Sequence, residues 1–456
     1  MNNFKEIVSK NSGSPHLLVV GFWSVVSWKY MRFIENYIEN SVIDSYSMID
    51  IESQREVIKS KVEKILIKPK NNFYLSDWNT WKDIKNIDEF INIIDFLKKK
   101  NNNLKIFIST DPRYHEWYLE YCLENNIDCL VEKPIITPMT WNEFDPSLYN
   151  EKMAKLLKLA NSKDWNFSVM SWSRYHEIFN WWVIDKLEEK MEAHNTPITS
   201  FHLRTSSGVW NLYNEFIERE DHPYKYWFGV LNHWAYHYID ILAQCLELNK
   251  KLLGEELKLT ISSFVAYPID QSVRISKKVH DKLDWGWDKN FWRTGELENY
   301  GETDIVTNFS LTDSNWKVIT LWTLSLEHTT PSCRNWSVLD YDEYNKNWRL
   351  PCTDIEVQLS SLYSVHAHMF KKPENFLQYN AEVLYRSNKE ITNDDQYYKR
   401  EIYPDFESKW KYKLIKNWLE WHEENSKLTQ HSLTMKILEK LAISIKKPGE
   451  SINFNI

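Results

Sequence analysis

The fold is decided by the stretch Leu104-Lys105-Ile106-Phe107-Ile108-Ser109-Thr110-Asp111-Pro112-Arg113-Tyr114-His115 and by the later stretch Cys129-Leu130-Val131-Glu132-Lys133-Pro134. The apolar run 104–108 predicts a buried strand, and residues 114–125 predict a helix. A second short strand over 129–131 then ends at the Glu-Lys-Pro tripeptide. A strand, a helix and a second strand of these lengths predict a β-α-β unit with parallel strands.

The same alternation extends towards the N-terminus. Residues 17–20 form another apolar run of the kind found in buried parallel strands, and strands are also expected at 43–49 and 72–75. Apolar residues at helical spacing lie between 87 and 97. We therefore predict a Rossmann-type, doubly wound parallel sheet over residues 1–140, ending where prolines 134, 138 and 146 interrupt regular structure.

Residues 141–456 show a different pattern. Alternating apolar and polar residues predict strands at 200–206, 257–267, 304–311, 316–325, 336–341 and 355–361. Thr312-Asp313-Ser314-Asn315 is a turn sequence of the type that joins antiparallel neighbours. Leu433, Ile437 and Leu441 form one stripe of a helix. This part is predicted to be an α+β domain with a mostly antiparallel, open-faced sheet.

Composition excludes several classes of protein. The chain has 456 residues, 43% apolar and 26% charged, which suits two folded domains. A net charge of −8 without basic clusters argues against a nucleic-acid partner. No early apolar stretch is long enough to cross a membrane, and the five cysteines include no C-x-x-C pair. We therefore expect a cytoplasmic protein with reduced thiols.

The first strand leads into Gly21-Phe22-Trp23-Ser24-Val25-Val26, where a dinucleotide-binding fold holds pyrophosphate. Of the three fingerprint glycines, only Gly21 is present, because Trp23 and Val26 occupy the other two positions. Asp50, near the end of the second strand, is placed to accept hydrogen bonds from a ribose. The alternatives are an ordinary strand-to-helix turn and a solvated acid at a strand end.

Thr110…His115 and Glu132-Lys133-Pro134, in register with their strands, resemble motifs of the Gfo/Idh/MocA oxidoreductases, relatives of glucose–fructose oxidoreductase and inositol dehydrogenase. A third match is Gly229 to Asp240, which keeps the family's His237 and Asp240 but has His233 in place of its first Asp. Weaker similarities are 167–174, 302–304 and 444–450. The resemblance covers the whole chain except an apparent enlargement around 330–410.

This resemblance implies an NAD(P)-dependent oxidoreductase that transfers a hydride to or from a sugar, a polyol or a related small metabolite, including an imine or natural-product intermediate. Lys133 is expected to contact cofactor and substrate, His237 to act as general acid/base, and His233 to support it. The domain 141–456 would bind substrate and form a homodimer or homotetramer. Asp50 favours NAD over NADP, and Arg55 leaves NADP open. The expected cofactor contacts are Gly21, Phe22, Trp23, Asp50, Thr110, Pro112, His115, Glu132 and Lys133, and the expected substrate contacts are Arg174 and Asp240.

Other interpretations stay open. Lys133 fits a solvated loop lysine, His237 a core histidine, and His115 a loop cap. His233 and His237, one helical turn apart, form half of a metal site without a further ligand, so no metal is predicted. Because the glycine-rich loop and the Asp position are altered, the chain also fits a redox-inactive family member that binds a ligand or a protein.

Overall fold

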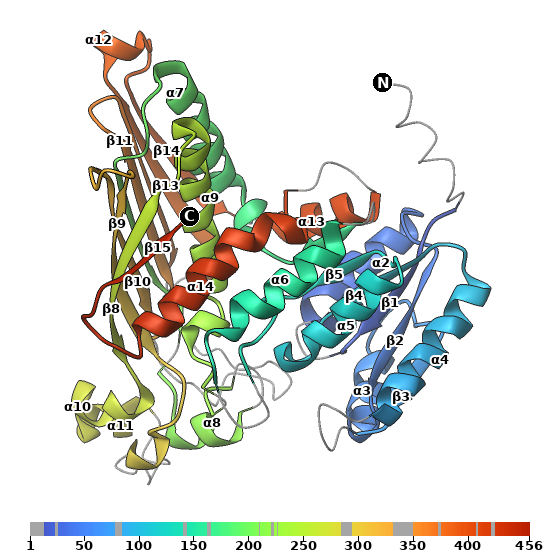
Figure 1. Ribbon diagram of the computed structural model, residues 1–456. Coiled ribbons are helices and arrows are strands. Elements are labelled where there is room, and N and C mark those ends of the chain that lie inside the picture. Colours follow the sequence, from blue (N-terminus) through green and yellow to red (C-terminus); the bar gives the residue numbers. More distant parts are fainter. Residues whose placement is uncertain are drawn as a thin grey trace. The chain divides into compact units, whose positions relative to one another are not determined.

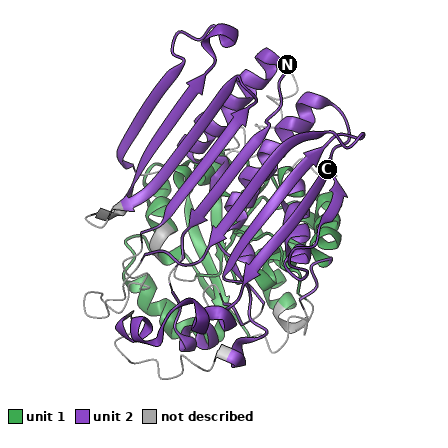
Figure 2. Ribbon diagram, turned by 90° about the vertical axis from the view of Figure 1, so that its left-hand side faces the viewer, with its two compact units in different colours: residues 1–143, 148–171, 410–432 green, residues 144–147, 172–409, 433–456 purple. Residues whose placement is uncertain are grey.

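The computed structural model describes residues 13–22, 26–77, 84–139, 144–161, 166–208, 210–219, 223–225, 227–283, 294–331, 350–372, 375–406, 409–420 and 425–456. The chain divides into two compact units, coloured separately in Figure 2. Unit 1 comprises residues 1–143, 148–171 and 410–432, and unit 2 comprises 144–147, 172–409 and 433–456. Two segments beyond residue 140 therefore belong to the first unit, in addition to the predicted 1–140.

Unit 1 is built on a parallel six-stranded sheet with the order β3-β2-β1-β4-β5-β6. This order confirms the predicted doubly wound fold, because it reverses direction between β1 and β4. The strands are β1 (His16–Val20), β2 (Ser45–Ile51), β3 (Asn72–Leu75), β4 (Leu104–Ile108), β5 (Cys129–Val131) and β6 (Phe167–Val169). The helices are α2 (Met31–Glu39), preceded by a π-helical turn Val26–Tyr30, α3 (Arg55–Glu63), α4 (Ile84–Lys100), α5 (Pro112–Glu124), α6 (Leu148–Asn161) and α13 (Trp410–Glu420) (Figure 1).

A buried ion pair ties the late helix α13 to this early sheet. Lys105 of β4 and Asp128, just before β5, are buried, and Nζ lies 2.9 Å from Oδ2. The Lys105 ammonium also donates to the Trp418 carbonyl of α13 at 3.2 Å. Asp128 Oδ1 accepts from the backbone N–H of Asn166 at 3.1 Å, so each charge has a second hydrogen bond.

Unit 2 contains a nine-stranded sheet with the order β14-β13-β12-β11-β7-β10-β9-β8-β15. Only β7 and β10 pair in parallel, which confirms a mostly antiparallel sheet. The strands are β7 (Ser200–Ser206), β8 (Lys258–Ala266), β9 (Asp304–Thr312), β10 (Val318–Glu327), β11 (Cys352–Leu359), β12 (Tyr363–Lys372), β13 (Asn375–Ser387), β14 (Tyr398–Phe406) and β15 (Ile452–Asn455). The helices are α7 (Lys186–His194), α8 (Tyr213–Glu218), α9 (Tyr236–Leu253), α10 (Gln271–Arg274), α11 (Lys277–Leu283), α12 (Lys389–Thr392) and α14 (Ser432–Ser444).

The two faces of this sheet differ. Helices α7, α9 and α14 lie along one face (Figure 1), towards which Trp322 and Leu324 of β10 are buried. We call the other side, onto which Figure 2 looks, the open face. It carries exposed apolar side chains, namely Phe264, Val306 and Leu321.

Several sequence expectations for unit 2 differ in detail from the structure. The turn 312–315 does join antiparallel β9 and β10. Strands β12 to β15 were not predicted, and β12, β13 and β14 lie within residues 330–410. The strand expected at 336–341 lies outside the described residues. Among the helices of the described ranges, none is both long and apolar enough to cross a membrane.

Candidate functional site

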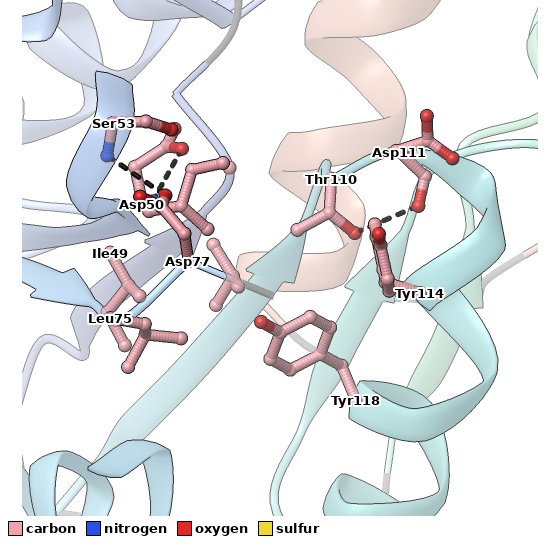
Figure 3. A pocket seen from close by; sticks show the side chains of 12 residues that line it. Ile49, Asp50, Ser53, Leu75, Asp77, Thr110, Asp111, Tyr114 and Tyr118 are labelled. Carbon is pink, nitrogen blue, oxygen red and sulfur yellow. Dashed lines mark hydrogen bonds between the residues drawn. The ribbon is translucent and has the colours of Figure 1, made fainter. Parts of the chain in front are cut away.

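A pocket of about 240 Å³ lies at the carboxyl ends of β1, β2, β3 and β4 of unit 1. It is placed at the strand-order reversal between β1 and β4, where open α/β sheets bind ligands. Figure 3 shows Asp50, Ser53 and Asp77 on one side of the pocket and Thr110, Asp111, Tyr114 and Tyr118 on the other. The remaining lining residues are Val20, Gly21, Ile49, Ile51 and Leu75.

Gly21 is the position in this pocket where only glycine fits. Its φ of +88° lies in the region that side chains rarely adopt. A Cβ there would lie 2.6 Å from the Ser109 carbonyl oxygen and 2.8 Å from the Thr110 Cα. The β1–α2 and β4–α5 connections therefore approach each other backbone to backbone. Trp23, the second predicted loop contact, lies outside the described residues.

Asp50 is held firmly at the pocket wall. Its Oδ2 accepts from the Phe22 N–H at 2.7 Å and its Oδ1 from the Ile51 N–H at 2.8 Å. Burial raises the pKa of this carboxyl, and the two backbone hydrogen bonds partly offset that rise. The Phe22 side chain itself is fully buried and does not line the pocket.

Two further carboxylates line the pocket and were not predicted. Asp77 follows β3, and its Oδ1 accepts from the Ser53 N–H at 3.0 Å. Asp111 caps α5 by accepting from the Arg113 N–H at 2.9 Å. Both lie just beyond the carboxyl end of a strand, and Asp50 lies just before the end of its own strand. A search of the sequence for acidic residues at the carboxyl ends of strands would therefore have found them. Arg55, which left NADP open, instead makes two bonds to Glu52, at 2.5 and 2.6 Å.

His115 connects two loops near this pocket without lining it. Its Nδ1 lies 2.8 Å from the Pro134 carbonyl oxygen and its Nε2 lies 3.0 Å from that of Thr110. Burial lowers the pKa of His115, and the hydrogen bonds to these two carbonyls partly oppose that fall. This geometry matches the loop-cap interpretation. Pro112 is the first residue of α5.

The Glu132-Lys133-Pro134 tripeptide follows β5. Glu132 Oε1 accepts from the buried Tyr30 hydroxyl at 2.5 Å. Burial raises the pKa of Tyr30, and Glu132 adds to that rise. The Lys133 side chain is half-buried, and its backbone N–H donates to Glu132 Oε2 at 3.2 Å. Neither Glu132 nor Lys133 lines the pocket described above.

His237 belongs to unit 2, on the first turn of α9. Its Nδ1 accepts from the Trp172 backbone N–H at 3.3 Å, and the two rings lie 5.2 Å apart. Because a backbone N–H can only donate, Nδ1 is unprotonated here and the neutral ring carries its proton on Nε2. The side chain is buried among aromatic rings, with 6% exposed.

Arg174 and Asp240, the predicted substrate contacts, are bound to each other. The Arg174 Nη2 lies 2.8 Å from Asp240 Oδ1, and the exposed fractions of the two side chains are 5% and 0%. Asp240 also accepts from the Ser173 hydroxyl and, at 2.7 Å, from the Thr434 hydroxyl of α14. These bonds fix α9 against the turn that contains Trp172.

His233 lies in a loop that is closed by glycines. A Cβ at Gly301 would lie 2.2 Å from the Gly229 nitrogen, and a Cβ at Gly229 would lie 2.2 Å from the Glu302 Cδ. Glu302 Oε1 accepts from the Leu231 N–H at 2.9 Å. The buried His233 ring meets Tyr224 edge-on at 4.9 Å. Glu302, which the sequence signals only as part of a weak motif, is thus the acid that supports this loop.

We expect Glu302 to make unit 2 less stable as pH rises. Burial raises the pKa of Glu302 from 4.5 to about 7, so the folded state holds a proton that the unfolded state has lost. The free energy of unfolding should fall by about 3 kcal/mol between about pH 4 and pH 8 through this group. The Glu302→Gln variant should lose this part of the pH dependence in chemical denaturation.

The exposed Glu255→Gln is the control, and it should keep the wild-type slope. If Glu302→Gln and the wild type showed the same pH dependence, Glu302 would be ionised in the folded protein.

The structure thus gathers Gly21, Asp50 and Thr110 in one pocket of unit 1, and Arg174, His237 and Asp240 around the start of α9 in unit 2. Lys133 and His237 belong to different units, so their joint action on one substrate atom stays a prediction. Within the described residues, none of the groups able to hold a metal includes His233 or His237.

No protein-family model and no curated protein matches the chain. Solved structures with a similar fold include the WlbA dehydrogenase from Bordetella pertussis in complex with NADH and UDP-GlcNAcA, at 12% identity and a TM-score of 0.54, covering 97% of this chain and 99% of that one. An oxidoreductase from Agrobacterium radiobacter in complex with NAD+, L-tartaric acid and magnesium has 11% sequence identity and a TM-score of 0.52. The match covers 96% of this chain and 98% of that one. The aldose-aldose oxidoreductase from Caulobacter crescentus has 10% sequence identity and a TM-score of 0.53, and the match covers 97% of this chain and 100% of that one. These matches confirm the resemblance to the Gfo/Idh/MocA oxidoreductases in fold.

Proposed function

We propose that the chain is an NAD-dependent oxidoreductase that acts on a sugar, a polyol or a related small metabolite. The observation that carries the proposal is the pocket at the strand-order reversal, where Gly21 lets two loops approach and carboxylates line the wall. The NADH and NAD+ named for two proteins of similar fold support the cofactor class, and UDP-GlcNAcA supports a sugar-like substrate.

The pocket fits the ribose of a dinucleotide. Asp50 presents a fixed, buried carboxylate, and Asp77 adds an acceptor for hydroxyl groups, whereas the oxygens of Asp111 already accept from Arg113. Gly21 leaves the backbone bare where a side chain would fill the space. When bound, a nicotinamide cofactor supplies or takes up a hydride.

The remaining roles fall to two side chains. We assign Lys133 the hydrogen bond and positive charge that stabilise a substrate oxygen as negative charge develops on it. His237 presents Nε2–H as a donor while Trp172 donates to Nδ1. The acid–base role expected for His237 therefore requires that the Trp172 hydrogen bond breaks. The charges of Arg174 and Asp240 are bound to each other, so we assign these two residues to positioning and not to substrate contact. They hold α9, which carries His237, against the turn that contains Trp172.

Cofactor preference gives a direct test. Asp50 and Asp77 bring negative charge to the pocket wall, whereas Arg55 is bound to Glu52 and Arg113 to Asp111, so a 2′-phosphate would be repelled. Calorimetric titration, after a check for copurified nucleotide, should show NADH binding more tightly than NADPH by about tenfold or more, equivalent to about 1.4 kcal/mol. Asp50→Ala should weaken the binding of NADH and reduce the difference between the NADH and NADPH affinities.

The exposed Asp395→Ala is the control and should leave both affinities unchanged. Binding of neither nucleotide to well-folded protein would overturn the proposal and favour the redox-inactive, ligand- or protein-binding alternative. The predicted homodimer or homotetramer also stays a proposal, supported by Phe264, Val306 and Leu321 on the open face.

A further inference from the structure

Four side chains with metal-binding atoms gather on the open face of unit 2, separate from the cofactor pocket. Cys352 and Asp354 lie two residues apart on β11, and His366 and His368 lie two residues apart on β12. Because alternate residues of a strand share a face, each pair points to the same side. The strands pair antiparallel with Asp354 opposite His368, which brings the two pairs together.

The contacts between these side chains centre on Asp354. Its Oδ1 lies 2.5 Å from His368 Nδ1 and 3.5 Å from His366 Nε2. Its Oδ2 lies 3.3 Å from the Cys352 sulfur. Ligand atoms of Cys352, Asp354 and His368 all lie within 4.8 Å of one another. The side chains of Asp354, His366 and His368 are 29–38% exposed, so an ion can reach them.

From this geometry we infer that Cys352, Asp354, His366 and His368 form a binding site for a divalent transition metal of the zinc type. One thiolate, two imidazoles and one carboxylate are a ligand set that Zn²⁺ accepts in tetrahedral geometry. Bonds of about 2.0–2.3 Å place such ligand atoms about 3.3–3.8 Å apart, so small side-chain rotations suffice. The bound ion would replace the Asp354–His368 hydrogen bond and pin β11 to β12.

The surrounding charges favour this assignment. A thiolate at Cys352 and the Asp354 carboxylate together balance the charge of a divalent ion. The nearby Arg204 is bound to Glu327 at 2.7 Å, and Glu382, opposite His368, is bound to Arg400 at 2.5 Å. These neighbours are therefore paired with each other and leave the four ligands available.

The sequence did not signal this site, since the prediction of no metal rested on His233 and His237 lacking a further ligand, and the cysteines include no C-x-x-C pair. Here the spacing is C-x-D on one strand and H-x-H on the next, and it becomes a cluster only through strand register.

Cobalt provides the test, because Co²⁺ replaces Zn²⁺ and reports its ligands by colour. Chelator-treated full-length protein is titrated with Co²⁺ alone. We expect one ion per chain, visible bands of a four-coordinate ion and a near-ultraviolet thiolate-to-cobalt band, all displaced by Zn²⁺. Cys352→Ser should abolish the thiolate band, and His368→Ala should weaken Co²⁺ binding by about 10- to 100-fold or more.

Two controls separate this cluster from other thiols and histidines. Cys245→Ser changes a buried cysteine on α9, and His202→Ala changes an exposed histidine on the same face that contacts Ser200 and Thr323. Both should bind Co²⁺ as the wild type does, and circular dichroism should show that every variant is folded. Absence of the thiolate band in wild-type protein, or its persistence in Cys352→Ser, would overturn the inference.

Discussion

Replacing Gly21 with alanine is expected to destabilise unit 1 by about 2–5 kcal/mol and to weaken NADH binding by about tenfold or more. The new Cβ would lie 2.6 Å from the Ser109 carbonyl oxygen, and the φ of +88° adds backbone strain. Both the β1–α2 and β4–α5 connections would have to move, and both form the pocket wall. Urea denaturation and calorimetric titration measure the two effects.

Gly254 provides the matched control. It has a φ of +66° at the end of α9, but a Cβ there would meet nothing within 4 Å. Gly254→Ala should therefore cost only about 1 kcal/mol, the penalty of the backbone conformation alone. Equal costs at the two positions would show that Gly21 is not a point of close backbone approach.

The second large effect is expected for Asp240→Asn, which should destabilise unit 2 by about 3–5 kcal/mol. The change leaves the buried Arg174 guanidinium without a counter-charge and weakens the bonds from Ser173 and Thr434. Since these bonds hold α9 against the Trp172 turn, the His237 environment should change as well. Chemical denaturation and the NMR signal of the His237 ring report both changes.

A double variant distinguishes lost charge pairing from lost packing. Arg174→Met combined with Asp240→Leu should recover part of the stability, because no charge then remains buried. Lys277→Ala, which removes an exposed ion pair with Asp281, should have little effect. If Asp240→Asn were as mild as Lys277→Ala, the pair would contribute nothing to the fold.

The sequence predicts the sheet of unit 1 well, because most of its strands are short apolar runs that alternate along the chain with helical segments. The same reasoning finds Gly21 and Asp50. Gly21 directly follows the end of β1, and Asp50 lies one residue before the end of β2. It assigns Phe22 to the cofactor, whereas the fold buries that ring and only its N–H reaches Asp50. Local pattern shows where a residue lies along a strand but not which atom faces a pocket.

Long-range pairing is what the sequence could not supply. Arg174 and Asp240 are both charged and were assigned to substrate, yet they satisfy each other across 66 positions of chain. Strand β12 alternates buried Val365 and Ala367 with the polar His366 and His368, so its strand pattern is present in the sequence, whereas its pairing with β11 is not. The cluster at Cys352 depends on the register of two strands, which no local motif encodes.

The return of α13 to unit 1 has a consequence for synthesis on the ribosome. Lys105 is made early, but the Trp418 carbonyl that accepts its hydrogen bond comes 313 positions later. At about 5–20 residues per second, the ribosome needs about 15–60 s to cover that distance. Throughout this interval the nascent N-terminal sheet lacks one of its covering helices. A chaperone that binds exposed apolar strands should therefore contact this chain during translation and release it only after α13 has emerged.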